Sequence, residues 1–253
     1  MQFTLLRTLR KLKAHRPYAI QWEYVRDNKK LRKFSFTSPF TGKRLSAIWS
    51  NNQDLRELVL AFDRNKWQAI DLGNPQIIVD LGSNNGYSGL YFKDRFPKAT
   101  LYLVDLLQTN TLFGNNLFHA NGLHATHVNV AISGSDGLLD IDLHPAHSRN
   151  RLSSLLDEEQ KQRFGFSGTQ IKVPSRRLTS LMKDVQIDRI DLLKVDIEGA
   201  EQYLIEDIGD WSPHVNQVLL EVHHNIDTNW CEQKIRSAGY SLIKDYGDWY
   251  LHK

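Results

Sequence analysis

The chain lacks the features that mark secreted and membrane-spanning proteins. Its 253 residues contain a single cysteine, Cys231, which excludes an intramolecular disulfide and suits a reducing compartment. No apolar run approaches the roughly 20 residues of a membrane-spanning helix, and no secretory signal is evident. No internal repeat or low-complexity tract is present either. These absences lead us to expect a cytoplasmic globular protein.

The motifs of two common nucleotide sites are also missing, although the chain has the apolar strand and the glycine-rich loop on which such sites are built. Residues 77–81 are a near-continuous apolar run, typical of a strand covered on both faces, and the Gly/Asn-rich stretch 82–86 follows it. Its spacing, Asp-x-Gly-x-Asn-x-Gly, is neither Gly-x-Gly-x-x-Gly nor the Gly-Lys-Ser/Thr of a P-loop. The glycines let the backbone turn sharply, and Asn84 tolerates a positive φ. The stretch predicts a ligand-binding bend between a strand and a helix.

Acids at the ends of two strands indicate the charge of that ligand. The bend has no lysine to clamp a triphosphate, and Asp80 would repel a pyrophosphate while favouring an amine or a sulfonium. A second apolar strand, 101–104, ends in Asp105, where α/β nucleoside sites place an acid for the ribose hydroxyls. Together these acids predict a nucleoside that carries positive charge.

The composition, with 41% hydrophobic and 24% charged residues, is that of one ordinary globular domain with a short extension. The net charge of +3 hides an asymmetry. Residues 1–33 carry ten Lys/Arg and two acids, or +8, so the rest of the chain carries −5. Four leucines would lie on one face of a basic helix: Leu5, Leu6, Leu9 and Leu12. A helix docked on the domain, a membrane-surface anchor and a polyanion site all remain open.

From residue 75 onward the hydrophobic pattern alternates between strand and helix, which is typical of an α/β fold. Central strands are predicted at 77–81, 101–105, 126–132, 190–196 and 216–222. Helices are predicted near 87–95, 108–120, 199–207 and 228–238. A hairpin is predicted at the end of the chain, over 240–252, and another around the turn 134–137. Before residue 75 we expect a strand or loop pair around 39–42 and a helix over about 54–67. The predicted boundary separates a helical and β extension, 1–74, from the α/β domain, 75–253.

Residues 144–169 do not fit this alternation. They are rich in His, Ser, Arg and Gly, and loops of such length are often functional or mobile. A solvated insertion and a lid over a second substrate are both consistent with the composition. His144 and His147 have no convergent partner ligands in the pattern, so we assign no metal to them.

A charged sequence follows the apolar residues of the strand near 190. Alternation places Lys194, Asp196 and Glu198 on one side of the strand, where each desolvated charge costs roughly several kcal/mol unless it is paired. One interpretation is structural: Lys194 and Asp196 neutralise each other, while Glu198 and Glu201 complement the start of the next helix. The other is a functional cluster, which we favour.

The last central strand repeats this arrangement, because its apolar run ends in Glu221 and His223. In open α/β sheets the ligand crevice lies at the carboxyl ends of the strands. We therefore expect the polar residues at the strand ends to converge on one site. They are Asp80, Asp105, Asp196, Glu221 and His223.

Several of these stretches resemble the FkbM-type family of class I S-adenosylmethionine-dependent methyltransferases. The resemblance rests on residues 79–87, on 129–133 followed by Gly137, on 177–181 and above all on 193–201, and it covers roughly residues 75–244. It implies a Rossmann-like, mostly parallel seven-stranded sheet with an antiparallel last strand. It also implies methyl transfer to a hydroxyl oxygen, often on a sugar, a glycan or a small natural product.

The resemblance also assigns roles around the cofactor, S-adenosylmethionine. The loop that holds the methionine part would consist of Asp80, Gly82, Ser83, Asn84 and Gly86. Asp105 resembles the ribose anchor, where the family more often has Glu, and Asn129 and Ala131 resemble the region beside the adenine. Thr179 stands where many relatives have Asp, which leaves the turn 177–179 without an assigned role.

Transfer to an alcohol requires that the acceptor lose a proton. His223, Asp196 or Glu198 could act as the general base, and we favour His223 for its intrinsic pKa and Asp196 for its position. Lys194 would orient or polarise the acceptor, and Glu221 would complete the cluster. Alternatively Asp196, Glu198 and Glu221 would hold Mg²⁺, which we leave open without assigning a metal site.

Two rival functions stay open. An RNA ribose methyltransferase is favoured by the basic N-terminus but opposed by the acidic catalytic half, so a nucleic-acid partner is not expected. A non-catalytic cofactor-binding scaffold is opposed by the retained charges at the strand ends. The expected partner is a hydroxylated small molecule or glycan, and the sequence does not indicate an oligomeric state.

Overall fold

The computed structural model describes residues 23–25, 32–49, 52–62, 67, 70–144, 151–155, 157–166, 168–223, 226–245 and 248–253. The expected basic helix around residues 5–12 lies outside these residues, as does His147, so the predictions about them stay predictions. Among the described residues, no helix is long and apolar enough to cross a membrane.

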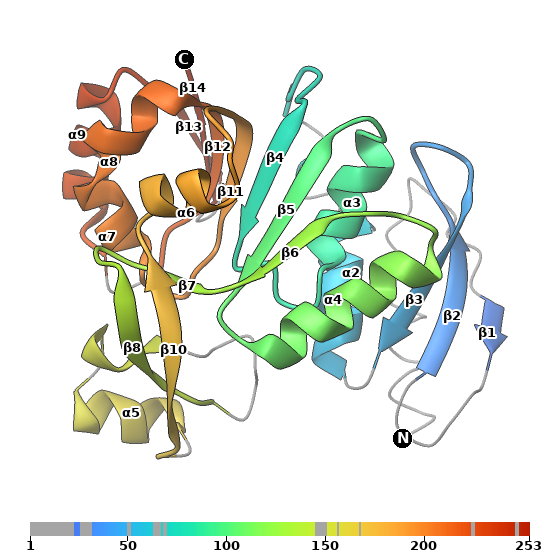
Figure 1. The fold of residues 1–253 in the computed structure, drawn as a ribbon, viewed down its shortest axis with the longest axis horizontal. Helices are drawn as coiled ribbons and strands as arrows, with labels where there is room; N and C mark the ends of the chain where they lie inside the picture. Colours follow the sequence, from blue (N-terminus) through green and yellow to red (C-terminus); the bar gives the residue numbers. More distant parts are fainter. Residues whose placement is uncertain are drawn as a thin grey trace.

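A seven-stranded sheet forms the centre of the molecule (Figure 1). Its strands, in spatial order, are β13 (Ser241–Asp245), β14 (Asp248–His252), β12 (Val215–Glu221), β11 (Ile190–Val195), β4 (Ile77–Leu81), β5 (Thr100–Asp105) and β6 (Thr126–Asn129). β14 is antiparallel to both of its neighbours, and every other pair is parallel. The predicted mostly parallel sheet with an antiparallel last strand is therefore confirmed.

Alternate residues along these strands face two separate hydrophobic cores. Ile78 and Leu192 pack on one face with helices α2 (Asn52–Phe62), α3 (Tyr87–Arg95) and α4 (Gln108–Ala120). Val79 and Leu193 pack on the other with α6 (Leu178–Asp184), α7 (Glu201–Glu206), α8 (Ile208–Trp211) and α9 (Thr228–Ser237). A short 3₁₀ turn, η3 (Ser212–His214), leads into β12. Two covered faces explain why the central strands are apolar without alternation.

A second, four-stranded sheet is inserted between β6 and β11, and it corrects two predictions. The expected strand 126–132 breaks at Val130, whose amide donates to Asp105 O, and β7 (Ala131–Ile132) joins the second sheet. The expected hairpin at 134–137 is wrong, because β10 (Gln170–Arg176) lies between β7 and β8 (Gly137–Asp142). β9 (Arg151–Leu152) completes the order β7-β10-β8-β9.

The described part of the segment 144–169 is not a plain loop. It contains β9, the 3₁₀ turn η2 (Ser153–Leu155) and helix α5 (Glu158–Phe164). The side chain of Asp157 caps α5 by accepting from Gln160 N, and Gln160 returns a hydrogen bond to Asp157 N. Figure 1 shows α5 beside β8 and β10, at the opposite side of the molecule from the N-terminal strands.

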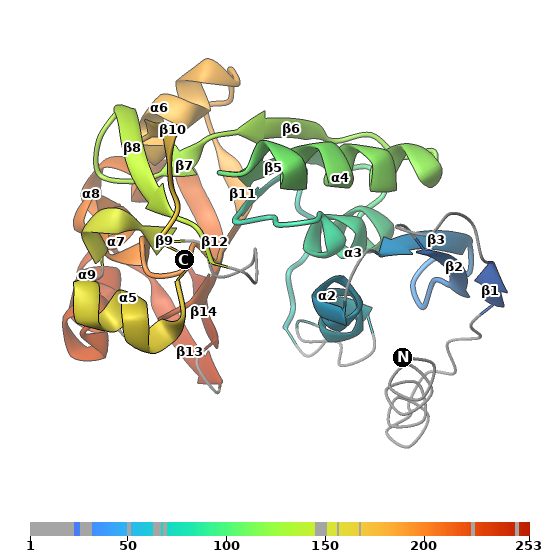
Figure 2. The same cartoon turned by 90° about the horizontal axis from the view of Figure 1, so that it is seen from below.

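The N-terminal strands form a small antiparallel sheet of β1 (Glu23–Val25), β2 (Arg32–Thr37) and β3 (Arg44–Trp49). The predicted strand or loop pair is a pair of strands, β2 and β3. The described part of the predicted helix, α2, runs to Phe62, and residues 63–66 lie outside the described residues, so the predicted end near residue 67 stays a prediction. Phe36 of β2 and Phe62 of α2 belong to the same buried cluster as Tyr91 of α3. Figure 2 shows α2 beside α3. The described part of the extension therefore shares its core with the α/β domain.

Candidate active site

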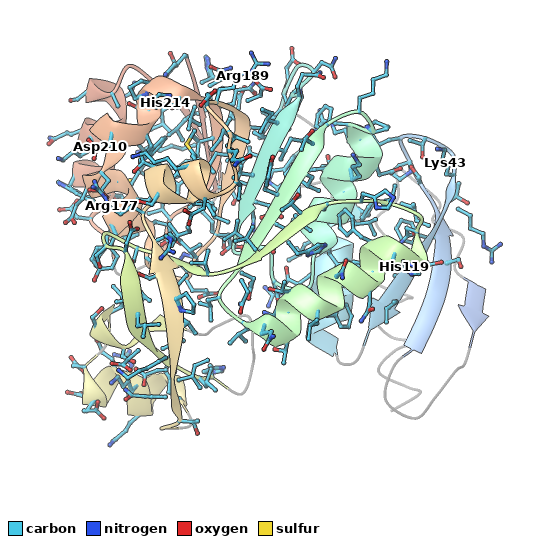
Figure 3. All side chains as sticks on the ribbon, viewed as in Figure 1. Lys43, His119, Arg177, Arg189, Asp210 and His214 are labelled. Carbon is cyan, nitrogen blue, oxygen red and sulfur yellow. The ribbon has the colours of Figure 1, made fainter. Side chains whose placement is uncertain are left out.

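The carboxyl ends of the central strands define the edge on which the site lies. Figure 3 places Arg189 and His214, which directly precede β11 and β12, together at the amino edge of the sheet. The bend after β4 and the turn after β11 follow the opposite edge, where ligands of open α/β sheets bind.

The predicted bend after β4 has the backbone conformation that its sequence indicates. Gly82, Asn84 and Gly86 have φ values of +74°, +47° and +83°. The amides of Gly82 and Ser83 both donate to Val104 O, at 2.9 and 3.0 Å, which fixes the bend to β5. A Cβ added at Gly82 would lie 1.7 Å from the carbonyl oxygen of Asp196. Only glycine fits there, so the bend is in direct contact with the end of β11.

Asp80 and Lys194 form a buried ion pair between β4 and β11. The Lys194 Nζ lies 3.1 Å from Asp80 Oδ1, and Ser88 Oγ donates to Asp80 Oδ2 at 2.5 Å. Lys194 also donates to Gly82 O at 3.0 Å. Burial lowers the pKa of Lys194, but the neighbouring carboxylates raise it above its ordinary value. Asp80 is completely buried, so its negative charge faces Lys194 rather than an open pocket.

Asp105 closes the bend from the other side. Its Oδ2 accepts from Asn84 N at 2.9 Å, and its Oδ1 accepts from Leu107 N at 2.8 Å and from Asn110 Nδ2 at 3.1 Å. Burial raises the pKa of Asp105 to about 6, although these hydrogen bonds lower it. Asp105 therefore ties the bend to the start of α4.

The two residues expected beside the adenine lie at the end of β6 and at the start of β7. The Asn129 side chain donates to Asp105 O at 3.0 Å, which holds the end of β6 against β5. Ala131 is buried and belongs to a third hydrophobic cluster, together with Ala200 after β11. The inserted sheet thus packs directly against the turn that follows β11.

The predicted acidic cluster forms around His223. Its Nε2 lies 3.5 Å from Glu198 Oε2 and 3.9 Å from Asp196 Oδ1. Glu221 lies close by, since one polar atom each of Asp196, Glu221 and His223 fall within 4.8 Å of one another. Of the five residues expected to converge, Asp196, Glu221 and His223 come together. Asp80 is instead buried against Lys194, and Asp105 contacts the bend and the start of α4.

The sequence did not indicate Glu201 as a partner of His223. Glu201 is completely buried at the first position of α7, and its Oε1 lies 3.1 Å from His223 Nδ1. Burial lowers the pKa of His223, but the hydrogen bond to Glu201 and the nearby carboxylates raise it to about 9. At neutral pH His223 is therefore protonated, which argues against the expectation that it acts as the general base.

The cluster does not fit a metal site well. Asp196, Glu221 and His223 are the candidate group among the described residues, and this group differs from the three carboxylates that the sequence suggested, because His223 stands in the place of Glu198. The ammonium of Lys194 also lies 3.7 Å from Asp196 Oδ2. The positive charges near Asp196 are thus supplied by side chains.

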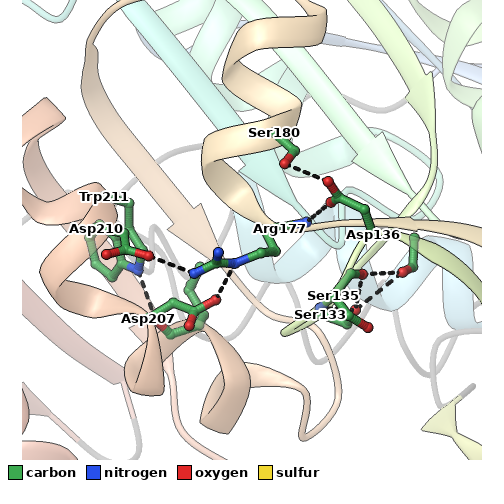
Figure 4. Close-up of polar contacts among 10 residues, drawn as sticks. Ser133, Ser135, Asp136, Arg177, Ser180, Asp207, Asp210 and Trp211 are labelled. Atoms are coloured by element: carbon green, nitrogen blue, oxygen red, sulfur yellow. Dashed lines mark hydrogen bonds and ion pairs between the residues drawn. The ribbon is translucent and has the colours of Figure 1, made fainter.

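A polar network around Arg177 joins α6 to the segments that follow α7 (Figure 4). The Arg177 guanidinium contacts Asp207 at 2.9 Å and Asp210 at 2.5 Å, in the segments that follow α7. Asp136 accepts from Arg177 N at 2.8 Å and from Ser180 Oγ at 2.7 Å. The carboxylate at the start of α6 is therefore supplied by Asp136. The turn 177–179 has no carboxylate of its own, because this chain has Thr at position 179. The network joins the inserted sheet, α6 and α7–α8.

The strand order, the single antiparallel strand and the bend after β4 define the class I, Rossmann-like methyltransferase fold. The model of the family described as "Methyltransferase FkbM domain" matches residues 80–249. The chain belongs to this family and is a methyltransferase, as the sequence resemblance implies.

Two curated relatives are similar over most of the chain. Methyltransferase sdnD of Sordaria araneosa is 24% identical over 221 residues, which are 74% of this chain and 82% of that protein. Methyltransferase 1 of Beauveria bassiana is 24% identical over 188 residues, 68% of this chain and 75% of that protein. A solved methyltransferase from Pyrococcus furiosus is 9% identical, with 75% of this chain and 81% of that chain covered and a TM-score of 0.42.

Proposed function

We propose that the protein transfers a methyl group from S-adenosylmethionine to a hydroxyl oxygen of a sugar, glycan or small natural product. The observation that carries this proposal is the contact between the bend and the acidic cluster, where Gly82 meets the backbone of Asp196. A cofactor in the bend would thereby present its methyl group beside carboxylates that can receive a proton.

The cofactor would lie along the bend, between β4 and β5. The open backbone of Gly82 and Gly86 would let the methionine part approach closely. Asp105 would accept a hydrogen bond from the ribose, in addition to those it receives from the protein, because each carboxylate oxygen has two lone pairs. Asn129 and Ala131 would border the adenine. Asp80 would act indirectly, by holding Lys194 and Ser88 beneath the bend.

The chemistry needs alignment and a base. The sulfonium is already a good electrophile, so holding the acceptor oxygen in line with the sulfur–methyl bond supplies up to roughly 7–11 kcal/mol. We assign the base to Asp196, because His223 already carries a proton at neutral pH and Lys194 is buried in its ion pair. Glu198 is the second candidate, at 3.5 Å from His223.

The acceptor would be neutral or positively charged. Among the described residues, the carboxylates near Asp196 are those of Glu198, Glu221 and the buried Glu201. The cations near it are His223 and Lys194, and Lys194 is also paired with Asp80. This surplus of carboxylates attracts the sulfonium and repels phosphates, so it favours a hydroxylated small molecule over RNA.

The first test is a calorimetric titration with S-adenosylmethionine and S-adenosylhomocysteine. A screen of hydroxylated acceptors, with and without Mg²⁺, and of RNA transcripts would follow. We expect both cofactor forms to bind, and transfer to a small acceptor to be unaffected by Mg²⁺. Absence of binding would overturn the proposal, and transfer to RNA alone would overturn its acceptor class.

The second test separates binding from chemistry. We expect Asp196→Asn to keep the affinity for S-adenosylhomocysteine and to lose at least about 100-fold in transfer rate, the usual contribution of a general base. Asp140→Asn, which alters an exposed pair with Lys172 on the inserted sheet, is the matched control and should change neither. Equal activity of Asp196→Asn and the wild type would remove Asp196 as the base.

A further inference from the structure

We propose that Glu201 is a positioning residue that holds His223 as an imidazolium, with the Nε2 side of the ring turned towards Asp196 and Glu198. This inference deepens the proposed function and rests on it. It gives His223 a role as a fixed positive charge beside the base, and it gives the buried carboxylate of Glu201 a role outside its own helix.

Glu201 is fixed on both of its oxygens. Oε1 accepts from Ile197 N and Oε2 accepts from Gly199 N, both at 2.8 Å. These bonds close a turn in which Glu198 and Gly199 have φ values of +54° and +102°. A positive φ at a non-glycine residue is costly, so the turn needs such support. The carboxylate of Glu201 therefore cannot swing away from His223 without releasing the turn.

His223 lies between this fixed carboxylate and the acids of the site. Nδ1 faces Glu201 at 3.1 Å, while Nε2 faces Glu198 at 3.5 Å and Asp196 at 3.9 Å. Glu221 belongs to the same group, at the end of β12. A ring with carboxylates on both sides is most stable when both nitrogens carry a proton.

The other groups near the pair strengthen this arrangement. Cys231 of α9 is buried close to Glu201, and burial and the charge of Glu201 raise the pKa of its thiol to about 12. The thiol is thus neutral and adds no competing charge at neutral pH. Lys194 is committed to Asp80 and Gly82 O, although it also lies 3.7 Å from Asp196. Among the described residues, His223 is a cation that faces Glu198, with 3.5 Å between its Nε2 and Glu198 Oε2.

The imidazolium has a clear consequence for the proposed reaction. It offsets the mutual repulsion of Asp196 and Glu198, so that both carboxylates can stay at the end of β11. It also leaves Asp196 as the group that receives the proton of the acceptor. Without the Glu201 carboxylate, His223 would lose its proton near neutral pH and the two acids would repel each other.

The experiment is an NMR titration of the full chain with labelled histidine, in which the His223 signal is identified by its loss in His223→Gln. In the wild type we expect His223 to titrate near pH 9. In Glu201→Gln the midpoint should fall by at least one pH unit, and in Glu198→Gln by less, because Glu198 lies farther from the ring. Glu158→Gln, on the exposed face of α5, should leave the midpoint unchanged.

A wild-type midpoint at the ordinary value near 6.5 would overturn the inference, and so would an unshifted midpoint in Glu201→Gln. If Glu201→Gln does not fold, a variant that carries both Glu198→Gln and Asp196→Asn still decides, because a midpoint that stays high without the two carboxylates that face Nε2 points to Glu201. With an acceptor found in the screen, the transfer rate should fall at alkaline pH, where His223 loses its proton. In each variant the pH of this fall should shift together with the midpoint of His223. Failure of wild-type protein to bind S-adenosylhomocysteine would count against the proposed function and leave the titration result standing.

Discussion

Asp105 shows at the level of one residue how the fold prepares a charged group for a ligand. Burial raises its pKa to about 6, although three protein donors stabilise its charged form. An acid whose folded pKa is raised favours the folded state most below its unfolded pKa, near 3.8, and this contribution is lost as the pH rises through about 6. The charged form therefore lowers stability at neutral pH, which fits a residue kept for binding.

We expect this titration to govern cofactor affinity. Protonation removes an acceptor for the ribose, so the affinity for S-adenosylhomocysteine should fall as the pH drops through about 6. It should be about tenfold lower at pH 5 than at pH 7, because one pH unit below the pKa about a tenth of the carboxyl is charged. Calorimetry over this range measures the effect.

The control is Asp105→Asn, whose affinity should be lower at pH 7 and should change little with pH. Asp140→Asn, an exposed acid, should keep the wild-type pH dependence. Equal wild-type affinity at pH 5 and pH 7 would exclude Asp105 as a ribose contact.

Gly82 provides a second prediction at this scale. In Gly82→Ala the new methyl group would lie 1.7 Å from Asp196 O, at a backbone φ of +74°. We expect a loss of at least about 3 kcal/mol in the free energy of unfolding, because the added group cannot be accommodated without backbone shifts. Cofactor binding should be lost as well. Urea unfolding and calorimetry measure the two effects.

Gly122→Ala is the matched control, because Gly122 has a similar φ of +63° and no atom within 4 Å of the added Cβ. It should lose only the conformational part, about 1–2 kcal/mol. Similar losses in both variants would mean that the bend does not press against β11.

At the scale of elements, β4 and β11 are joined by more than their backbone ladder. Lys194 and Asp80 are register partners on these neighbouring strands, and their side chains form the buried ion pair. Lys194→Met should lower the free energy of unfolding by about 3–5 kcal/mol, because it leaves the Asp80 charge buried without its cation. Urea unfolding measures the change.

Lys172→Met is the matched control for this prediction. It removes an ion pair of similar length, 3.0 Å to Asp140, but one whose side chains are 69% and 49% exposed. Its cost should stay within about 1 kcal/mol. Equal costs in the two variants would show that burial of the Asp80 pair contributes nothing.

The sequence predicted elements well where the pattern was local. The apolar runs of β4, β5, β11 and β12 have the predicted bounds within one residue, because both faces of these strands are covered. It failed where pairing was distant. The partner of both β7 and β8 is β10, some thirty or more residues further along the chain, and no local pattern indicates it.

The same distinction applies to the candidate site. The convergence of Asp196, Glu221 and His223 followed from their positions at strand ends. The pairing of Lys194 with Asp80 depends on the register between two strands, which the sequence does not give. The contact of Glu201 with His223 depends on a turn in which Glu198 and Gly199 both have a positive φ. The glycine indicates one of these two positions, whereas the sequence does not indicate the positive φ of Glu198.

The whole molecule is held together by cores that cross the predicted domain boundary. Phe36 of β2 packs edge-on against Phe62 with a centroid distance of 4.9 Å, and Phe62 packs in the same way against Tyr91 of α3. The side chain of Asn121, after α4, accepts from Ser46 N and donates to Ser46 O. The N-terminal strands therefore complete the α/β domain on one face of its sheet.

We consequently expect the extension and the domain to unfold in one transition. Phe36→Ala should lower the free energy of unfolding of the whole protein by about 3–5 kcal/mol, because Phe36 is buried in the shared core. Leu112→Ala, at an exposed position on α4, should change it by no more than about 0.5 kcal/mol. Calorimetry, followed in parallel by near- and far-ultraviolet circular dichroism, measures both. The opposite outcome would be that Phe36→Ala splits the unfolding into two transitions and shifts only one of them. The extension would then be a separate unit, and its strands would play no part in holding α3 and the bend that precedes it.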